Sequence, residues 1–251
     1  MKVKIIDAHF LRKKFEILFV ILCVIIAITL TFNFISFSDE DTDIEAVSQN
    51  EISKIVIIDP GHGGVDAGAT GVSGVYEKDL NLEIAFTLGE LLKEKGYTVV
   101  YTRTTDKLLY REEENIKGMR KFYDLKNRCA VAEGYEDAIF ISIHMNSFGA
   151  SKYSGLQVYY SNNNDKSRLL ADKIQSSVRA NLQPTNNRQI KNGKDIYILD
   201  NCKALSVLVE CGFLSNPEEC EKLSQKEYQK ELCFSILCGI IDYNEAEVLE
   251  N

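Results

Sequence analysis

The chain has 251 residues, of which 45% are apolar and 26% are charged. These proportions fit a globular protein and exclude a disordered chain, a collagen-like repeat and a small disulfide scaffold. The net charge of −8 is unevenly distributed: residues 1–14 carry five Lys and Arg, whereas residues 39–251 carry 24 basic and 35 acidic residues. A basic head on an acidic body argues against nucleic acid as the main partner.

The N-terminal forty residues have the pattern of a targeting segment. Residues 17–37 carry no charge and are almost all apolar, and at ~1.5 Å per residue such a helix spans a ~30 Å hydrocarbon core. Basic residues before it and acidic residues after it place the N-terminus in the cytosol and the body outside. We predict a cytosolic head (1–14), a transmembrane anchor (15–37), a linker (38–53) and a folded domain (54–245). The alternative is a cleaved signal peptide and a secreted protein, although no clear cleavage site follows residue 37.

Six of the seven cysteines belong to the exported body. They form no CxxC pair, which argues against a cysteine zinc site. Disulfide bridges are one interpretation, but several of these cysteines fall within apolar helix or strand patterns. We therefore favour mostly free, buried thiols.

The body alternates short β-rich runs with amphipathic helices. The predicted strands cover residues 54–59, 97–103, 138–144, 155–161, 196–199 and 205–211. The predicted helices cover about 77–95, 121–134, 165–182 and 226–243. Strands separated by helices indicate a single α/β domain with a twisted, mostly parallel sheet of about six strands and helices on both faces.

Two histidines of the body stand where such a sheet gathers its functional groups, beyond the carboxyl ends of the strands. His62 follows the first strand within a glycine-rich loop, and His144 ends the third. Two His and one carboxylate form a zinc set that leaves a fourth position for water. The alternatives are an incidental histidine in a glycine-rich turn for His62 and a hydrogen-bonded core histidine for His144.

Two glutamates are candidate partners of these histidines. Glu77 opens the first long helix, where an acid also simply complements the helix dipole. Glu210 lies within a run of Val and Leu near the end of the last strand. A buried, unpaired carboxylate is costly, so Glu210 is expected to form a structural ion pair or to act as a general base beside a metal.

Several separated motifs, in order, resemble the zinc-dependent N-acetylmuramoyl-L-alanine amidases of the amidase-3 family. They are IVIIDPGHGGVDAGATG (55–71), EKDLNLEIA (77–85), TR with a following Asp (102–106), FISIHMNS (140–147), SGLQVYY (154–160) and LVECGFLSNPEE (208–219). The resemblance covers about residues 54–243. The short chain with one anchor and no wall-binding repeats is most similar to the spore-cortex, germination-specific members, which help to make muramic δ-lactam.

The resemblance implies a role for each matching residue. His62, Glu77 and His144 match the family's Zn²⁺ ligands, and Glu210 matches its catalytic glutamate. Asn146 is a candidate for substrate binding. The implied reaction is hydrolysis of the amide between N-acetylmuramic acid and L-alanine by a zinc-activated water, with Glu210 as general base.

The resemblance also implies partners and a location. These are peptidoglycan as the substrate, the membrane through the N-terminal helix, and a protein activator as a further candidate partner. The catalytic domain is expected outside the cytosol, with the space between the membranes of a developing spore as one candidate location. The alternative functions are a zinc-binding but catalytically silent wall-binding or scaffold protein, and a zinc carboxypeptidase that acts on the stem peptide.

Overall fold

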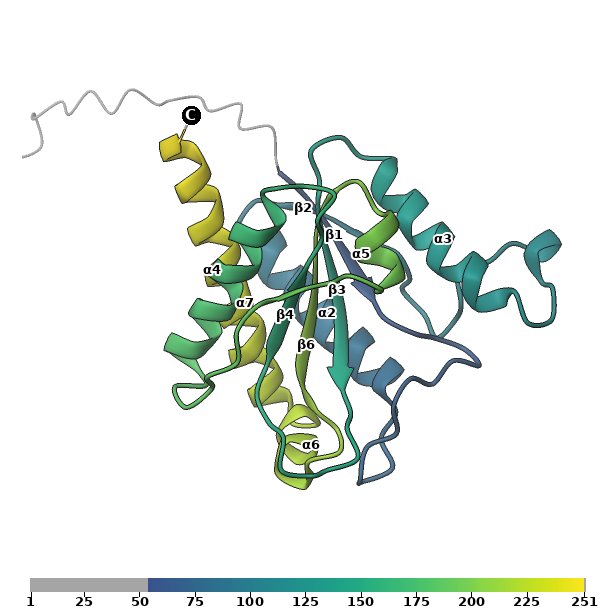
Figure 1. Cartoon of the computed structure of the whole chain (residues 1–251), viewed down its shortest axis with the longest axis horizontal. Coiled ribbons are helices and arrows are strands. Elements are labelled where there is room, and N and C mark those ends of the chain that lie inside the picture. Colours follow the sequence, from purple (N-terminus) through teal and green to yellow (C-terminus); the bar gives the residue numbers. More distant parts are fainter. Residues whose placement is uncertain (1–53, 251) are drawn as a thin grey trace, which may run out of the picture. The chain divides into compact units, whose positions relative to one another are not determined.

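The computed structural model describes residues 54–250, and the predicted head, anchor and linker (1–14, 15–37 and 38–53) lie outside the described residues. Within residues 54–250 no helix is both long enough and apolar enough to cross a membrane. The described chain alternates strands and helices, as the sequence predicts (Figure 1).

Six strands form one sheet in the order β2-β1-β3-β6-β4-β5. The strands are β1 (Ile55–Pro60), β2 (Thr98–Tyr101), β3 (Ile139–Asn146), β4 (Gln157–Tyr160), β5 (Lys191–Asn192) and β6 (Leu205–Phe213). Four of the five pairings are parallel, and β4 runs antiparallel to β6. The predicted single α/β domain with a mostly parallel sheet of about six strands is therefore confirmed.

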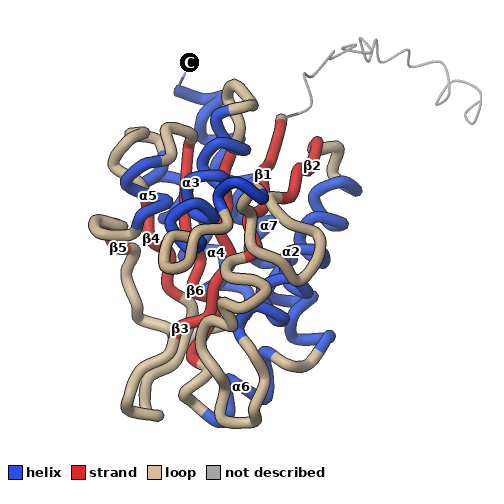
Figure 2. Tube along the Cα trace, turned by 90° about the vertical axis from the view of Figure 1, so that its right-hand side faces the viewer, coloured by secondary structure: helices blue, strands red, loops and turns tan. Residues whose placement is uncertain are grey.

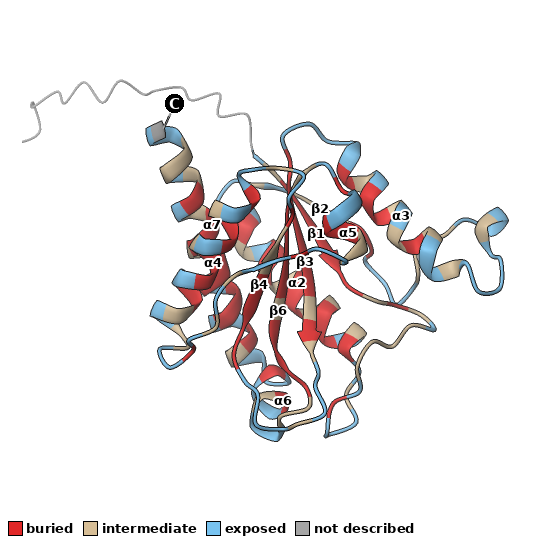
Figure 3. Ribbon diagram, viewed as in Figure 1, coloured by how far each residue is buried: buried red, intermediate tan, exposed pale blue. Residues whose placement is uncertain are grey.

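Helices cover both faces of the sheet. The helical elements are α2 (Glu77–Glu94), the 3-10 helix η1 (Glu112–Glu114), α3 (Arg120–Glu133), α4 (Ser167–Asn181), α5 (Tyr197–Asn201), α6 (Pro217–Leu223) and α7 (Lys226–Glu250). The apolar faces of α2, α4 and α7 pack in one large core cluster, and those of α3 and α5 pack in a smaller cluster. Figure 3 shows the buried strands between these layers.

The side chains of β3 alternate between an apolar face and a face that carries polar groups of the site. Ile141 and Ile143 belong to the large cluster, whereas Phe140 belongs to the smaller one. Successive side chains of a strand point to opposite faces, so Ser142 and His144 lie on the face that carries α3 and α5. Among the described helices this face packs against the 14-residue α3 and the five-residue α5.

The prediction of a strand at residues 196–199 is wrong. These residues enter the short helix α5, and the strand at this edge is the two-residue β5, which pairs with Tyr159 and Tyr160 of β4. A short apolar run does not by itself distinguish a strand from a buried helix. The reversal at Asp195, whose φ is 73°, turns the chain so that Ile198 packs against α3.

Two further helical features differ from the sequence prediction. Helix α6 was not predicted, although Asn216 caps it by accepting hydrogen bonds from the backbone N–H groups of Glu218 and Glu219, and Pro217 stands at its first position. Helix α7 continues past the predicted end at 243 to Glu250. Figure 2 shows α6 beside the loops at the lower end of the sheet.

The six cysteines within the described residues are all free, and five of them are buried. This confirms the interpretation as free thiols. Cys129 of α3 and Cys202, at the end of α5, share the smaller core cluster. These thiols help to pack the two helices that border the carboxyl end of β3.

Helices α4 and α7 cross closely at Gly239. A Cβ atom added at this residue would lie only 2.5 Å from the Ile174 Cα. We expect Gly239→Ala to lower the free energy of unfolding by ~1–3 kcal/mol, although alanine has the higher helix propensity. Urea denaturation measures the change. Gly149→Ala is the control, since no heavy atom lies within 4 Å of its added Cβ. Equal or higher stability of the Gly239 variant would contradict this view of the crossing.

Candidate metal centre and active site

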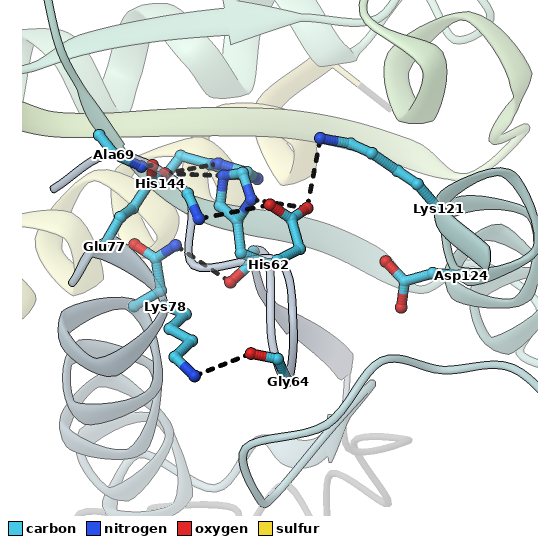
Figure 4. Close-up of polar contacts among 12 residues, drawn as sticks. His62, Gly64, Ala69, Glu77, Lys78, Lys121, Asp124 and His144 are labelled. Carbon is cyan, nitrogen blue, oxygen red and sulfur yellow. Dashed lines mark hydrogen bonds and ion pairs between the residues drawn. The ribbon is translucent and has the colours of Figure 1, made fainter. Parts of the chain in front are cut away.

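Two histidines and a glutamate from three separate segments converge at the carboxyl edge of the sheet (Figure 4). The Glu77 Oε1 atom lies 3.1 Å from His62 Nε2 and 3.0 Å from His144 Nδ1. One ligand atom from each residue lies within 4.8 Å of the other two, a spacing that could hold a metal ion. The structure therefore brings together the three residues that the sequence singled out for zinc.

Glu77 is fixed by backbone donors as well as by the imidazoles. Its Oε1 atom accepts a hydrogen bond from the Met145 N–H, and its Oε2 atom accepts one from the Ala69 N–H. Burial would raise the Glu77 pKa, but hydrogen bonds and charges from His144 and His62 hold it well below its ordinary value. The carboxylate is thus anionic and oriented before any ligand binds.

His62 is in an unusual backbone conformation, with a φ of 62°. Its Nδ1 atom lies 3.0 Å from the Asp66 Oδ2 atom, and Lys121 Nζ lies 3.2 Å from the same oxygen (Figure 4). Burial would lower the His62 pKa, whereas Asp66 and Glu77 raise it to about 9. Two carboxylates around the imidazoles make this pocket favourable for an added positive charge.

The turn that carries His62 is held by buried arginines. Arg128 of α3 donates Nη1 to the Pro60 carbonyl and Nη2 to the His62 carbonyl, both at 2.7 Å. Arg103 donates Nε to the Pro60 carbonyl at 2.9 Å and Nη2 to the Gly61 carbonyl at 3.0 Å. Three consecutive carbonyls are thereby satisfied, which fixes the path of the backbone through His62.

Buried carboxylates neutralise Arg128. Asp59 accepts Arg128 Nη1 at 2.6 Å, Thr102 Oγ1 at 2.5 Å and Ser142 Oγ at 2.7 Å, and Asp124 accepts Arg128 Nε at 2.9 Å. Burial would raise the Asp59 pKa, but Arg128 and the two hydroxyls hold it below its ordinary value. Asp59, which follows the apolar run of β1, is therefore an anion that anchors α3 to the sheet.

Gly61 leaves the room that His144 needs. A Cβ atom at residue 61 would lie 2.3 Å from the Cε1 and Nε2 atoms of His144. The imidazole edge therefore lies against the backbone of the turn, where any side chain would displace it. Gly61 is therefore required because the His144 ring packs against its backbone, and not because of its own φ angle.

Glu210 of β6 lies beside the cluster of His62, Glu77 and His144. It is the register partner of His144 in the parallel β3–β6 pair. Its Oε2 atom is buried and has no hydrogen-bond partner among the described residues. Burial raises the Glu210 pKa to about 7, with His144 and His62 lowering it and Glu77 raising it further. A carboxyl group with this pKa beside a cation site has the properties of a general base.

A pocket of about 150 Å³ opens beside these residues. Its lining includes both histidines, Lys121 and Leu125 of α3, and Tyr197 of α5. Asn146 is the last residue of β3, and its carbonyl accepts a hydrogen bond from the Leu214 N–H. It lies two residues beyond His144, and its predicted role in substrate binding stays a prediction.

The structure also shows site residues that the sequence reasoning missed. Asp59, Arg103, Arg128 and Asp66 were given no role, although all of them except Arg128 lie within the motifs. Asp59 had a readable signal, because an acid that ends a buried apolar strand must have a partner. The arginine that neutralises it lies 69 residues away on a helix, and no local pattern indicates that pairing.

Comparison with known proteins identifies the class. The sequence profile of the amidase-3 family, described as N-acetylmuramoyl-L-alanine amidase, matches residues 56–242. The chain therefore belongs to this family of cell-wall amidases, and the resemblance drawn from the motifs is confirmed.

Individual relatives are consistent with this family. The chain is 37% identical over 190 residues to the germination-specific N-acetylmuramoyl-L-alanine amidase of Bacillus subtilis, covering 76% of this chain and 79% of the relative. The structure of the CwlD amidase from Clostridioides difficile, in complex with the GerS lipoprotein, matches with a TM-score of 0.74 and 39% identity, over 77% of this chain and 100% of that chain. An N-acetylmuramoyl-L-alanine amidase from Clostridium difficile 630 matches with a TM-score of 0.67 and 31% identity, over 77% of this chain and 97% of that one.

We expect Arg128→Met to lower the free energy of unfolding by ~3–5 kcal/mol, because it leaves the buried Asp59 carboxylate without its ion-pair partner. Urea denaturation at pH 7 measures this loss. Lys222→Met is the matched control, since it removes an exposed pair with Glu218 and should change stability by at most ~0.5 kcal/mol. Equal effects of the two variants would contradict the anchoring role.

The same pair predicts a pH dependence. Because the native Asp59 pKa lies below its ordinary value of ~3.9, the pair contributes stability above that pH and loses it as the pH falls through the native pKa. The stability difference between the native chain and Arg128→Met should therefore shrink in acid. A difference that stays constant from pH 7 to pH 3 would contradict this assignment.

Proposed function

We propose that the chain hydrolyses the amide bond between N-acetylmuramic acid and L-alanine in peptidoglycan, with Zn²⁺ held by His62, Glu77 and His144 and with Glu210 as the general base. The observation that carries the proposal is the Glu210 carboxyl, whose buried Oε2 atom has no hydrogen-bond partner within residues 54–250, beside a convergent His-Glu-His cluster. Family membership supplies the bond that is cleaved.

The residues fit zinc for chemical reasons. Two imidazole nitrogens and one carboxylate oxygen are a common zinc set, and three protein ligands leave a coordination position open. Zinc bound there would supply a Lewis acid that polarises the amide carbonyl and makes water acidic enough to lose a proton near neutral pH. Asp66 Oδ2 lies 3.0 Å from His62 Nδ1, and the other ring nitrogen, Nε2, lies 3.1 Å from Glu77 Oε1 on the side of the site.

Glu210 performs the proton transfers in this scheme. Its carboxylate takes a proton from the attacking water as the water oxygen bonds to the amide carbon. It then gives that proton to the departing amine of L-alanine as the carbon–nitrogen bond breaks, so that the carboxylate is regenerated. With a pKa of about 7, Glu210 can both accept and return a proton near neutral pH.

We further propose that the substrate is spore-cortex peptidoglycan and that the reaction is a step toward muramic δ-lactam. Support comes from the germination-specific relative in Bacillus subtilis and from the structural match to an amidase in complex with a lipoprotein. A lipoprotein activator and an N-terminal membrane anchor belong to this proposal, and both place the reaction outside the cytosol.

Metal binding can be tested directly. We expect the purified full chain to bind one Zn²⁺, measured by calorimetry and by elemental analysis after dialysis. His144→Ala and Glu77→Gln should each weaken zinc affinity by at least ~100-fold, because a lost ligand is not replaced. Glu90→Gln, an exposed substitution on the same helix as Glu77, is the control. Unchanged zinc affinity in the ligand variants would contradict the assigned metal site.

The reaction is tested by product analysis. The purified full chain with Zn²⁺ should release from peptidoglycan peptides that begin with a free L-alanine amine, whereas a carboxypeptidase would release amino acids from the other end. We expect Glu210→Gln to lower kcat by ~10²–10⁴-fold while zinc binding is retained. Glu218→Gln, the same substitution at an exposed position, should keep full activity. Full activity of Glu210→Gln would overturn the mechanism.

A further inference from the structure

The half-buried Arg188 is connected to the neighbourhood of Glu210 through one intervening side chain, that of Gln157. Gln157, the first residue of β4, is the register partner of Glu210 across the antiparallel β4–β6 pair. Directly opposed residues of such a pair point to the same face and lie ~5 Å apart at their Cβ atoms. Arg188 donates Nη1 to the Gln157 Oε1 atom at 3.0 Å, which brings its guanidinium to the edge of the proposed active site.

Arg188 is held in a fixed orientation. Its Nε atom donates to the Ser154 carbonyl at 2.8 Å, and its guanidinium lies 4.4 Å from the centroid of the Phe213 ring. The Gln157 amide, which accepts the hydrogen bond from Arg188 Nη1, is itself fixed, because its Nε2 atom donates to the Gln189 carbonyl at 2.7 Å. The guanidinium is therefore preorganised rather than free to search for a partner.

This guanidinium retains unused binding capacity. Within residues 54–250 it forms no salt bridge with a carboxylate and its Nη2 atom makes no hydrogen bond, although its charge acts on the nearby Glu219 carboxylate, whose pKa is raised by burial and lowered in part by Arg188. Arg128 contrasts with it, because that arginine is paired with both Asp59 and Asp124. Arginine presents a planar donor array that matches a carboxylate, so the remaining capacity of Arg188 favours a carboxylate ligand.

Tyr159 provides a second measure of proximity. It follows Gln157 by two residues on β4 and lies on the same face of the sheet. Burial raises the Tyr159 pKa, Glu210 raises it further and Arg188 lowers it. Glu210 and Arg188 thus both act electrostatically on the same side chain.

The proposed substrate carries a carboxylate close to the cleaved bond. In peptidoglycan, the residue after L-alanine is a glutamate joined onward through its γ-carboxyl, which leaves its α-carboxyl either free or amidated. We propose that Arg188 binds this α-carboxylate when it is free, and that the enzyme therefore selects stem peptides that are not amidated at this position. This inference rests on the proposed amidase function.

The experiment uses two muramoyl tripeptides that differ only in whether the glutamate α-carboxyl is free or amidated. We expect the native chain with Zn²⁺ to prefer the free acid by ~10–100-fold in kcat/KM, the effect of one charge-assisted contact. Arg188→Gln should cleave both at similar rates, and Arg188→Lys should show an intermediate preference. Arg168→Gln, an exposed arginine on α4, is the matched control and should keep the native preference.

The outcomes separate this inference from the proposed function. If the native chain cleaves both tripeptides equally well, or if Arg188→Gln slows both by the same factor, the inference is wrong while the amidase function stands. If the native chain with Zn²⁺ cleaves neither, the proposed function fails. In that case calorimetry with Glu210→Gln still tests Arg188, because equal affinity for the two tripeptides would overturn the inference.

Discussion

The buried ion pair between Asp59 and Arg128 is the interaction on which the rest of the site depends. Asp59 lies near the carboxyl end of β1, and Arg128 comes from α3, so the pair joins the sheet to the helix that borders the pocket. The same guanidinium binds the carbonyls on both sides of Gly61. A buried ion pair adds little net stability compared with apolar packing, but its loss is costly and its geometry is specific. Here that specificity determines where the His62 imidazole lies.

The two faces of the sheet have different tasks. Alternate residues of β3 and β6 that point toward α2, α4 and α7 are apolar and fill the large core. The intervening residues on the opposite face include Ser142, His144 and Glu210. Because side chains alternate with a period of two, one register between β3 and β6 puts all three polar side chains on the same face. A slip of one strand by one residue would turn its polar side chains toward the apolar core.

Much of this arrangement could be predicted from the sequence, because it depends on local patterns. Apolar runs that end shortly before His62 and at His144 indicated strands, and the parallel topology placed their carboxyl ends at one edge. The strand predicted at 196–199 was wrong because four apolar residues carry no period that distinguishes strand from helix, and the backbone at Asp195 decided the outcome.

The remaining parts of the site depend on long-range pairing. Arg103 and Arg128 satisfy carbonyls of a turn that lies more than 40 residues earlier in the chain, and the sequence contains no periodicity that links them. The position of Arg188 likewise depends on the pairing of β4 with β6 and on the loop that returns from α4. Such contacts follow from the complete fold rather than from any one segment.

The reversed direction of β4 has a consequence for how the active site is assembled. In a sheet of only parallel strands, the edge that bears the chemistry is formed where strands end, and segments that lead into strands lie at the far edge. Since β4 runs opposite to β6, the segment that leads into β4 arrives at the catalytic edge, and Gln157 meets Glu210. Because β5 is parallel to β4, the segments that lead into both strands reach this edge and bring Gln157 and Arg188 to it, whereas His62 and His144 come from the carboxyl ends of β1 and β3. These two groups of residues can therefore vary in separate stretches of the chain.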